Sequence, residues 1–500
     1  MEGAGLSRFD VVSYSLLKAN IYNLNDMYNS KLFAILQHFD KYEQNRCRKY
    51  IQSPYFNRSE ELLTLYEAFL KVINGSKQNG GLDKPFLWSL LQPEQPYDDV
   101  RFRKYSSDLL KLIEGYLSQE IYEVNPVNKA INLIQSVGQR RIEKLYNSAV
   151  RSASRTLEKS PLKSSSFYLK RFEVENRSYE LDENKHTRTL RSNLDALNDN
   201  LDIFYFAEKL RYYCAALSNK FVTEKDYKVR FINEIIEHIK QKDIGDILPI
   251  SIYSRVLLTQ EKEEETQNYY VLKKLLEEHA LSFPQLEAMN IYISTINYCV
   301  RQINRGNQEF LKEIFELYED LINKEIIFLN DELSPWHFKN LVVVALRLGK
   351  YEWTERFIHN YSAKLPLAFR QNAISYNLAQ VYFYQKKHEK VIELLREVEY
   401  EDVAYNLGSK AMLLATYYET DEMEPLYSLF ESFRAYLNRH RDIPVNRRKN
   451  YGNLIRFTRK LTRIMPGDQP SIEKFKKDLE ETKNVASLNW LKEKLAELAD

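Results

Sequence analysis

The chain of 500 residues contains 72 Lys or Arg against 70 Asp or Glu, so its formal net charge of +2 excludes a protein that binds polyanions through its overall charge. Only 13 glycines and 14 prolines occur. This composition disfavours a sheet-and-turn protein and favours long helices with short connections, and no segment reaches the roughly 18 apolar residues of a membrane span.

Two interpretations of the weakly patterned residues 1–26 stay open. Either they precede a true start at Met27, or they fold as a leader helix through Val12, Leu16 and Leu17. They show no succession of basic, apolar and small residues typical of a secretory signal. Residues 27–120 follow, and their amphipathic segments, the first of which opens at Met27, predict a small helical N-terminal module.

Long helices are expected across residues 121–245, which we predict to connect this module to a repeat region. A helix over Asn193–Leu217 carries apolar residues at helical spacing, typical of a face turned to a core. Residues 246–440 contain antiparallel helix pairs punctuated by prolines and glycines where helix ends are expected. Residues 441–500 add a basic helix and a terminal amphipathic helix, which we expect to cap the stack.

Four turn positions in the repeat region recur at similar spacing. They are Gly306, Gly349, Lys386 and Asp421, separated by 43, 37 and 35 residues. A turn between two apolar helices about every 35 residues is typical of a helical solenoid, in which each pair covers the apolar face of the next. The sequence therefore predicts an all-α, right-handed superhelix of stacked antiparallel helix pairs, with Leu341, Leu378 and Leu413 buried at their contacts.

Three units within residues 335–433 resemble the tetratricopeptide repeat. Residues at matching offsets are Phe338, Leu341, Gly349, Tyr351 and Pro366 in the first unit, Leu378, Ala379, Tyr382, Val391 and Leu395 in the second, and Leu413, Tyr417, Leu426 and Phe430 in the third. The units depart from the family pattern at Thr354, His388 and Asp421. Upstream, the segment 53–57 (Ser-Pro-Tyr-Phe-Asn) resembles the start of a group of uncharacterised bacterial helical-repeat proteins, which implies no activity.

The tetratricopeptide resemblance implies a groove, lined by the first helix of each pair, that binds a peptide or a partner helix. By offset, the groove-facing residues would be Trp336, Lys339, Arg347, Tyr376, Gln380, Phe383, Tyr384, Ala415, Tyr418 and Glu419. Some members of the family clamp a C-terminal carboxylate, but Val343, Gly408 and Met412 stand at clamp positions here, so we expect no such clamp. A second interpretation stays open, in which these rings mainly pack between neighbouring helices.

Motifs for catalysis or for metal and cofactor binding are not found. No two of the eight histidines are closer than 22 residues, and the single Glu-x-x-His pair, Glu183 and His186, lies in a charged surface stretch. Phosphate-binding glycine loops and a nucleophile elbow are also missing. Three scattered cysteines without a Cys-x-x-Cys motif indicate reduced thiols of a cytoplasmic protein. We therefore predict a protein that is not an enzyme and holds no cofactor.

One segment is strongly basic. Residues 434–463 hold ten Lys or Arg against a single acid, Asp442. On a helix expected from about residue 445 to 464, four of these cations form a stripe: Arg456, Arg459, Lys460 and Arg463. The stripe is interpreted either as a solvated face, paired in part with acids of residues 468–481, or as a site for an anionic partner.

The function that these patterns favour is a cytoplasmic, non-enzymatic scaffold for protein–protein interaction, which holds a partner peptide or helix along a concave groove. The alternative is a nucleic-acid-associated protein that uses the basic C-terminal helix. Binding that depends on phosphate weakens steeply with salt, whereas binding in an apolar groove does not, so the two hypotheses can be separated.

Overall fold

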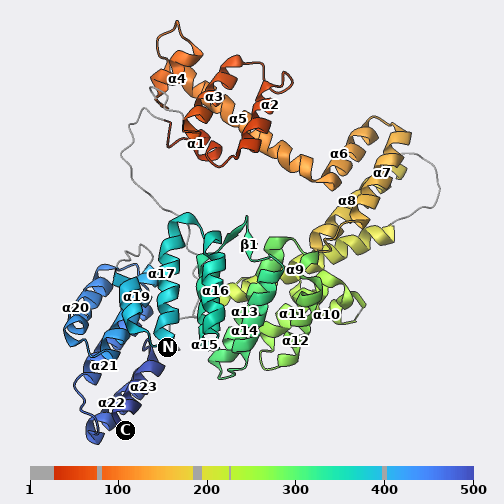
Figure 1. Cartoon of the computed structure of the whole chain (residues 1–500). Coiled ribbons are helices and arrows are strands. Elements are labelled where there is room, and N and C mark those ends of the chain that lie inside the picture. Colours follow the sequence, from red (N-terminus) through yellow and green to blue (C-terminus); the bar gives the residue numbers. More distant parts are fainter. Residues whose placement is uncertain are drawn as a thin grey trace. The chain divides into compact units, whose positions relative to one another are not determined.

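The computed structural model describes residues 27–75, 81–183, 194–223, 227–241, 243–396 and 403–499 (Figure 1). Both interpretations of residues 1–26, and the histidine of the Glu183–His186 pair, lie outside these ranges. Within them the chain forms 23 α-helices, three 3₁₀ helices and one two-stranded hairpin. The all-α fold predicted from the sequence is therefore confirmed. The right-handed superhelix and the expected domain boundaries stay predictions.

Two compact units make up the described chain. One comprises the described parts of Val11–Ser160 and Leu169–Asn200, and the other comprises Pro161–Tyr168 and the described parts of Leu201–Asp500. Helices α8 (Ser165–Glu183) and α9 (Leu194–Thr223) each contribute residues to both units. We call the first the N-terminal unit and the second the repeat unit.

The N-terminal unit contains seven complete helices. They are α1 (Lys31–Leu36), α2 (Lys41–Gln52), α3 (Glu60–Ile73), α4 (Lys84–Leu91), α5 (Asp99–Val124), α6 (Pro126–Gln139) and α7 (Glu143–Glu158). Helix α1 begins at Lys31 and not at Met27 as expected, because the Ser30 side chain accepts the N–H of Phe33 and so caps the helix there. Buried residues of α1 to α5, such as Tyr66 and Phe102, form the core of this unit.

The repeat unit contains the remaining elements. They are α10 (Ile232–Gln241), η1 (Asp243–Asp246), α11 (Leu248–Glu261), α12 (Thr266–His279), η2 (Ala280–Ser282), α13 (Gln285–Asn304), α14 (Phe310–Asn323), β1 (Phe328–Leu329), β2 (Glu332–Leu333), α15 (Pro335–Arg347), α16 (Tyr351–Tyr361), η3 (Ser362–Lys364), α17 (Leu367–Tyr384), α18 (His388–Arg396), α19 (Val403–Glu419), α20 (Met423–Arg439), α21 (Val445–Leu461), α22 (Gln469–Glu481) and α23 (Leu488–Ala499). The antiparallel strands pair Phe328 with Leu333.

Four helix pairs of the repeat unit share one turn geometry. The pairs are α13–α14, α15–α16, α17–α18 and α19–α20, and their turn residues are Gly306, Gly349, Lys386 and Asp421, with φ of 104°, 70°, 57° and 57°. In each turn this left-handed residue donates its N–H to the carbonyl three residues back, and the next residue donates to the carbonyl five residues back. That is the Schellman motif, so the spacing seen in the sequence marks four helix ends of the same kind.

Burial of the three leucines expected at pair contacts is uneven. Leu341 is fully buried, whereas Leu378 and Leu413 are only half-buried and pack at the edge of the cores. The neighbouring Ala379 and Leu414 have no exposed area. Asn377 and Met412, on the other side of these two leucines, are buried as well, so the prediction is confirmed for Leu341 only.

Buried tyrosines join alternate helices of the repeat unit. Tyr253 of α11 donates its hydroxyl to Glu287 of α13 at 2.8 Å, and Tyr269 of α12 donates to Glu313 of α14 at 2.8 Å. Both tyrosine rings are buried, so their apolar area stabilises the packing of the helices, while each hydroxyl donates a hydrogen bond to a carboxylate. Contacts between stacked helices thus explain part of the tyrosine content of the chain, which is 36 residues.

Candidate partner-binding surface

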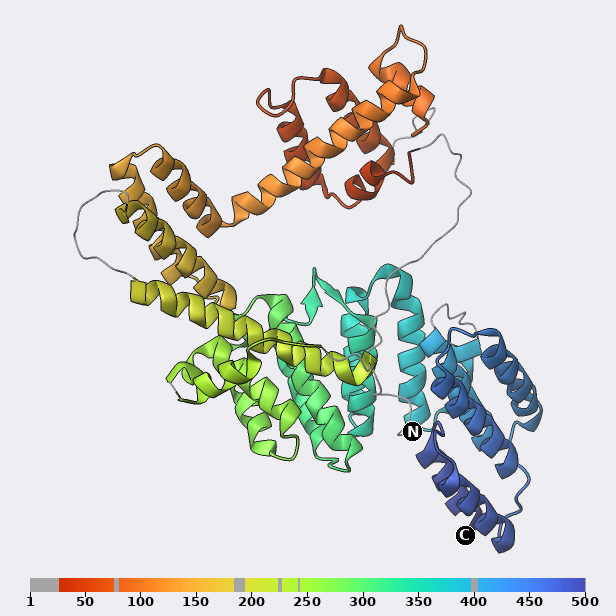
Figure 2. The same cartoon turned by 180° about the vertical axis from the view of Figure 1, so that it is seen from behind.

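The first helices of successive pairs, which we call the A helices, lie next to one another in the repeat unit. Helix α15 packs on α17, α17 on α19, α19 on α21, and α21 on α23. Figures 1 and 2 show α15, α17 and α19 as neighbours from opposite sides. Residues on three consecutive A helices can therefore combine into one surface, as the groove prediction requires.

A lysine surrounded by aromatic rings forms the best-defined part of this surface. The Lys339 Nζ atom lies 6.0 Å from the ring centre of Trp336, 5.1 Å from that of Tyr376 and 5.1 Å from that of Tyr405. Tyr376 and Tyr405 themselves meet edge to face at 5.0 Å. We call these four residues the lysine–aromatic cluster. Ammonium groups this close to several rings are held by cation–π attraction.

The cluster is buried at its base and open at its rim. Tyr376 and Tyr405 are 3% and 6% exposed, whereas Trp336 is 42% exposed. Three of the predicted groove residues, Trp336, Lys339 and Tyr376, are thus brought together. Tyr405 was not predicted, because it lies outside the repeat offsets used to choose the other positions. Its distance from Lys339 along the sequence gives no signal of the contact.

The remaining predicted groove residues of α15 and α17 lie in different environments. Gln380 is only 7% exposed, and its amide nitrogen lies 3.4 Å from the Tyr376 hydroxyl. Both side chains are therefore buried below the surface and cannot contact a partner directly. Phe383 and Tyr384 are half-buried, and the Tyr384 ring lies 6.4 Å from Tyr351. Arg347 donates to the Gln308 side chain at 3.1 Å, near the preceding turn.

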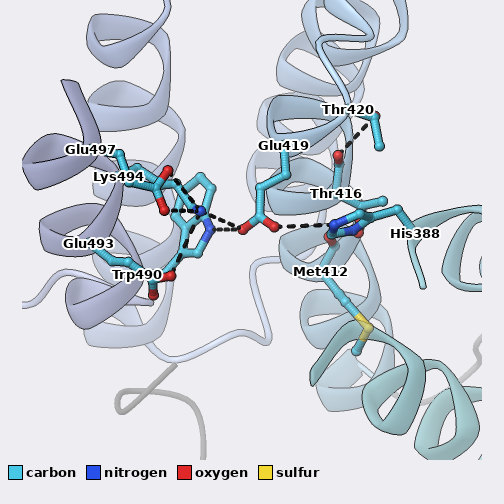
Figure 3. Close-up of polar contacts among 9 residues, drawn as sticks. All are labelled: His388, Met412, Thr416, Glu419, Thr420, Trp490, Glu493, Lys494 and Glu497. Atoms are coloured by element: carbon cyan, nitrogen blue, oxygen red, sulfur yellow. Dashed lines mark hydrogen bonds and ion pairs between the residues drawn. The ribbon is translucent and has the colours of Figure 1, made fainter. Parts of the chain in front are cut away.

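At α19 the predicted surface is already covered by the C-terminal helix α23 (Figure 3). The indole Nε1 of Trp490 donates to Glu419 Oε1 at 2.7 Å, and Lys494 Nζ lies 3.3 Å from the same oxygen. The Tyr418 ring meets the Trp490 ring edge to face at 5.6 Å. Tyr418 and Glu419 were both assigned to the groove, so at this end of the surface the chain supplies its own helix.

Opposite charges make this contact with α23 specific. Glu419 and Lys494 have side chains that are 12% and 6% exposed, and His388 Nε2 lies 3.4 Å from the second oxygen of Glu419. Burial by itself lowers the pKa of Lys494, but its hydrogen bond to Glu497 and the charges of Glu419, Glu497 and Glu493 outweigh burial and raise it. The lysine therefore stays charged and holds α23 in register.

The predicted basic stripe divides into two pairs. The helix that carries it, α21, ends at Leu461 and not near residue 464 as expected, so Arg463 lies in the turn beyond the helix. Arg459 forms an ion pair with Glu431 of α20, and Lys460 lies 2.5 Å from Asp478 of α22. Arg456 and Arg463 are exposed; Arg456 donates to the Thr482 hydroxyl at 3.1 Å and lies 4.6 Å from the ring centre of Phe457. Half of the stripe is thus engaged within the fold, which fits the interpretation that includes pairing with acids of residues 468–481.

The described residues offer little for catalysis. No group of three His, Cys, Asp or Glu side chains in the described ranges is arranged to hold a metal ion. Cys47, Cys214 and Cys299 are buried and form no disulfide, and burial raises the pKa of Cys47 and of Cys299 to about 12. Such thiols are unreactive near neutral pH. Among the helices that the structure describes, none is both long and apolar enough to cross a membrane.

A depression of about 480 Å³ lies beside the β1–β2 hairpin, where η2, α14 and η3 end. Its two lysines already have partners in the fold. Lys324 donates to the carbonyl oxygens of Leu276 and Glu277 at 3.0 and 2.9 Å, and Lys364 pairs with Asp331. Both cations of this depression thus complete local structure.

Comparisons of the chain with models of protein families, with curated proteins and with solved structures give no match.

Proposed function

We propose that the protein is a non-enzymatic interaction scaffold that holds a helix or an extended peptide of a partner protein along the A-helix face. This face consists of the lysine–aromatic cluster together with Phe383 and Tyr384, and it ends at Tyr418, which α23 already covers. The observation that carries the proposal is the cluster itself, since Lys339 lies near the ring of a tryptophan that is 42% exposed and near two buried tyrosine rings. Rigid, half-exposed Trp and Tyr side chains are the residues that contribute most to binding at protein interfaces.

The docking of α23 gives further support and indicates a binding mode. It is an amphipathic helix whose Trp490 and Lys494, four residues apart, face Tyr418 and Glu419. The A-helix face is therefore compatible with a helical ligand, which suits helix-in-groove recognition. The three buried cysteines form no disulfide with one another, which agrees with action in a reducing compartment such as the cytoplasm.

An affinity pull-down from native lysate tests the proposal, run with the parent chain, with Trp336→Ala and with Tyr427→Ala. Tyr427 is also 42% exposed but lies on α20, outside the A-helix face, which makes it a matched control. We expect a discrete protein that the parent and Tyr427→Ala retain, that Trp336→Ala loses, and that nuclease treatment leaves in place. Retention by all three variants would refute the assigned surface.

The second candidate, nucleic-acid binding through α21, depends on Arg456 and Arg463, the two exposed cations of the stripe. Reversing both to Glu changes the local charge by about four units while leaving the pairs of Arg459 and Lys460 intact. Nuclease-sensitive retention that this double variant abolishes would favour the second candidate over the scaffold.

A further inference from the structure

A row of five aromatic rings runs from the core of the N-terminal unit to its surface. Successive ring centres lie 5.8 Å apart from Phe39 to Tyr116, 5.9 Å from Tyr116 to Tyr50, 4.1 Å from Tyr50 to Phe56 and 5.0 Å from Phe56 to Tyr55. Exposure rises from Tyr116 outward, since Tyr116 is 3% exposed, Phe56 42% and Tyr55 88%. The outermost ring, Tyr55, therefore meets the edge or face of Phe56, which itself stacks on Tyr50, although almost all of Tyr55 meets solvent.

The turn that carries Tyr55 and Phe56 is fixed by hydrogen bonds. The amide of Asn57 donates to the carbonyl oxygens of Ile51 and Ser59 at 3.0 and 2.8 Å, and its own oxygen accepts the N–H of Ser59 at 2.9 Å. The N–H of Phe56 donates to the Ser53 carbonyl at 3.0 Å. This explains the Ser-Pro-Tyr-Phe-Asn segment: its Asn locks a turn whose aromatic residues point outward. A ring held this way loses little conformational entropy on binding.

Helix α2 and the turn that follows it are strongly cationic. Residues 41–58 contain five basic residues against one acid, Glu43, whose side chain is used to cap α2. Arg46 pairs with Glu120 and Arg48 with Glu67. The other three cations are exposed and have no partner in the described residues; they are Lys41, Lys49 and Arg58. Three cations that are unpaired among the described residues thus lie on the segment that carries the exposed rings, with Glu60 the next acid after Arg58.

Helix α2 carries a second exposed aromatic ring, that of Tyr42, near its N-terminal end. Tyr42 is 77% exposed, and Arg46 and Lys49 follow it at spacings of four and three residues, so all three share one face. At about 1.5 Å per residue, Tyr42 lies about 16 Å along the helix from Ser53, where the turn begins. Two exposed rings are therefore separated by a cationic strip.

We propose that this face binds single-stranded nucleic acid, with bases stacked on Tyr55 and Tyr42 and phosphates held by Lys49 and Arg58. Unstacked bases offer flat faces to such rings, and the backbone between them carries the negative charge that the cations need. A duplex keeps its bases stacked and so presents none to the rings. An acidic peptide satisfies the cations but gives the two rings no stacking partner. This site is independent of the A-helix face and of the stripe on α21.

Binding of a labelled oligothymidylate of about 20 nucleotides to the full chain, followed by fluorescence anisotropy, tests the proposal. We expect Tyr55→Ala to raise the Kd about tenfold and Tyr55→Trp to preserve it, because stacking requires the ring and not the hydroxyl. Lys49→Glu/Arg58→Glu should weaken binding at least tenfold, and affinity should fall steeply between about 50 and 200 mM salt.

A matched charge reversal at Lys71 and Lys104 provides the control. Both are exposed cations of the same unit, on α3 and α5, with no partner in the described residues. We expect Lys71→Glu/Lys104→Glu to bind like the parent, and circular dichroism to show equal helix content in all variants. Equal losses in both charge reversals, displacement by a duplex or by polyglutamate as effectively as by the single strand, or no binding by the parent at low salt would overturn the proposal.

Discussion

The ring of Tyr376 on α17 occupies the space beside Gly408 on α19 that any larger side chain would need. A Cβ atom at residue 408 would lie 3.0 Å from two ring carbons of Tyr376 and closer still to its hydroxyl oxygen. The absence of a side chain at 408 thus lets the two A helices approach and lets Tyr376 meet Lys339 and Tyr405. Residue 408 stands at a position that forms a carboxylate clamp in some tetratricopeptide repeats, whereas here it serves the packing of α17 against α19.

We predict that Gly408→Ala destabilises the repeat unit by about 1–3 kcal/mol, because the added methyl group overpacks a site closed by a buried ring. Gly452 is the matched control. It also lies inside a helix, but nothing stands within 4 Å of its missing Cβ atom, so Gly452→Ala should stabilise by about 0.5–1 kcal/mol. Chemical denaturation measures both; a neutral Gly408→Ala would mean that Tyr376 has room to move.

Substitutions at the Schellman turns should change the free energy of unfolding in opposite directions, depending on whether glycine is introduced or removed. Lys386 and Asp421 hold left-handed backbone angles that favour glycine, so Lys386→Gly and Asp421→Gly should each raise the free energy of unfolding by about 0.5–1 kcal/mol. Gly349→Ala should lower it by about 1 kcal/mol, although its missing Cβ atom would contact nothing within 4 Å. Thermal melts in which all three variants moved in the same direction would contradict this account.

These turns also show how much of the fold the sequence could reveal. Glycine, or a short polar residue between apolar helices, gives a local signal, and spacing alone located all four turns. The register was less well predicted, because Leu413 of α19 lies between two apolar residues and Leu378 of α17 is followed by the small residue Ala379, which is the buried one. Periodicity cannot decide which of two adjacent apolar residues, such as Leu413 and Leu414, faces the core.

The surface was harder to predict than the fold. Family offsets selected Trp336, Lys339 and Tyr376, but they could not reveal that Tyr405 completes the cluster, since that contact joins residues far apart in sequence. Nor could they show that Trp490 and Lys494 cover α19. A Trp and a Lys four residues apart on a terminal helix give a weak signal of docking, but the acid that receives them is only identified by the packing.

A buried carboxylate in the repeat unit gives a pH-dependent prediction. Glu287 is 9% exposed, and burial raises its pKa, although the hydrogen bond from Tyr253 and the charge of Arg211 oppose this shift. A carboxyl group with a raised pKa in the folded state destabilises the fold once it ionises. We therefore expect Glu287→Gln, which keeps an acceptor for Tyr253, to be more stable than the parent at pH 7 by on the order of 1 kcal/mol.

This advantage should shrink as the pH falls toward about 4, the ordinary carboxyl pKa, because Glu287 is then protonated in both the folded and the unfolded chain. Glu480→Gln on the exposed side of α22 is the control and should show no such change with pH. Urea denaturation at pH 5 and pH 8 measures the difference. A constant gap between Glu287→Gln and the parent would show that the charge of Glu287 is not the cause.

The contact between α19 and α23 yields the last prediction. Removing the carboxylate in Glu419→Ala leaves the Trp490 N–H without its acceptor and takes one of the nearby acids from a lysine that is almost fully buried. We expect a loss of about 2 kcal/mol, less than for an isolated buried pair because Glu497 still contacts Lys494 at 2.8 Å. Glu493 is 3.8 Å from the same ammonium and its side chain is 56% exposed, so Glu493→Ala should change stability by less than about 0.5 kcal/mol.

Hydrogen exchange should accelerate in α23 and not in α13 when Glu419 is replaced, because only the terminal helix is released. If α23 stayed as protected in Glu419→Ala as in Glu493→Ala, apolar packing alone would hold it, and the charges would have no part in fixing its register.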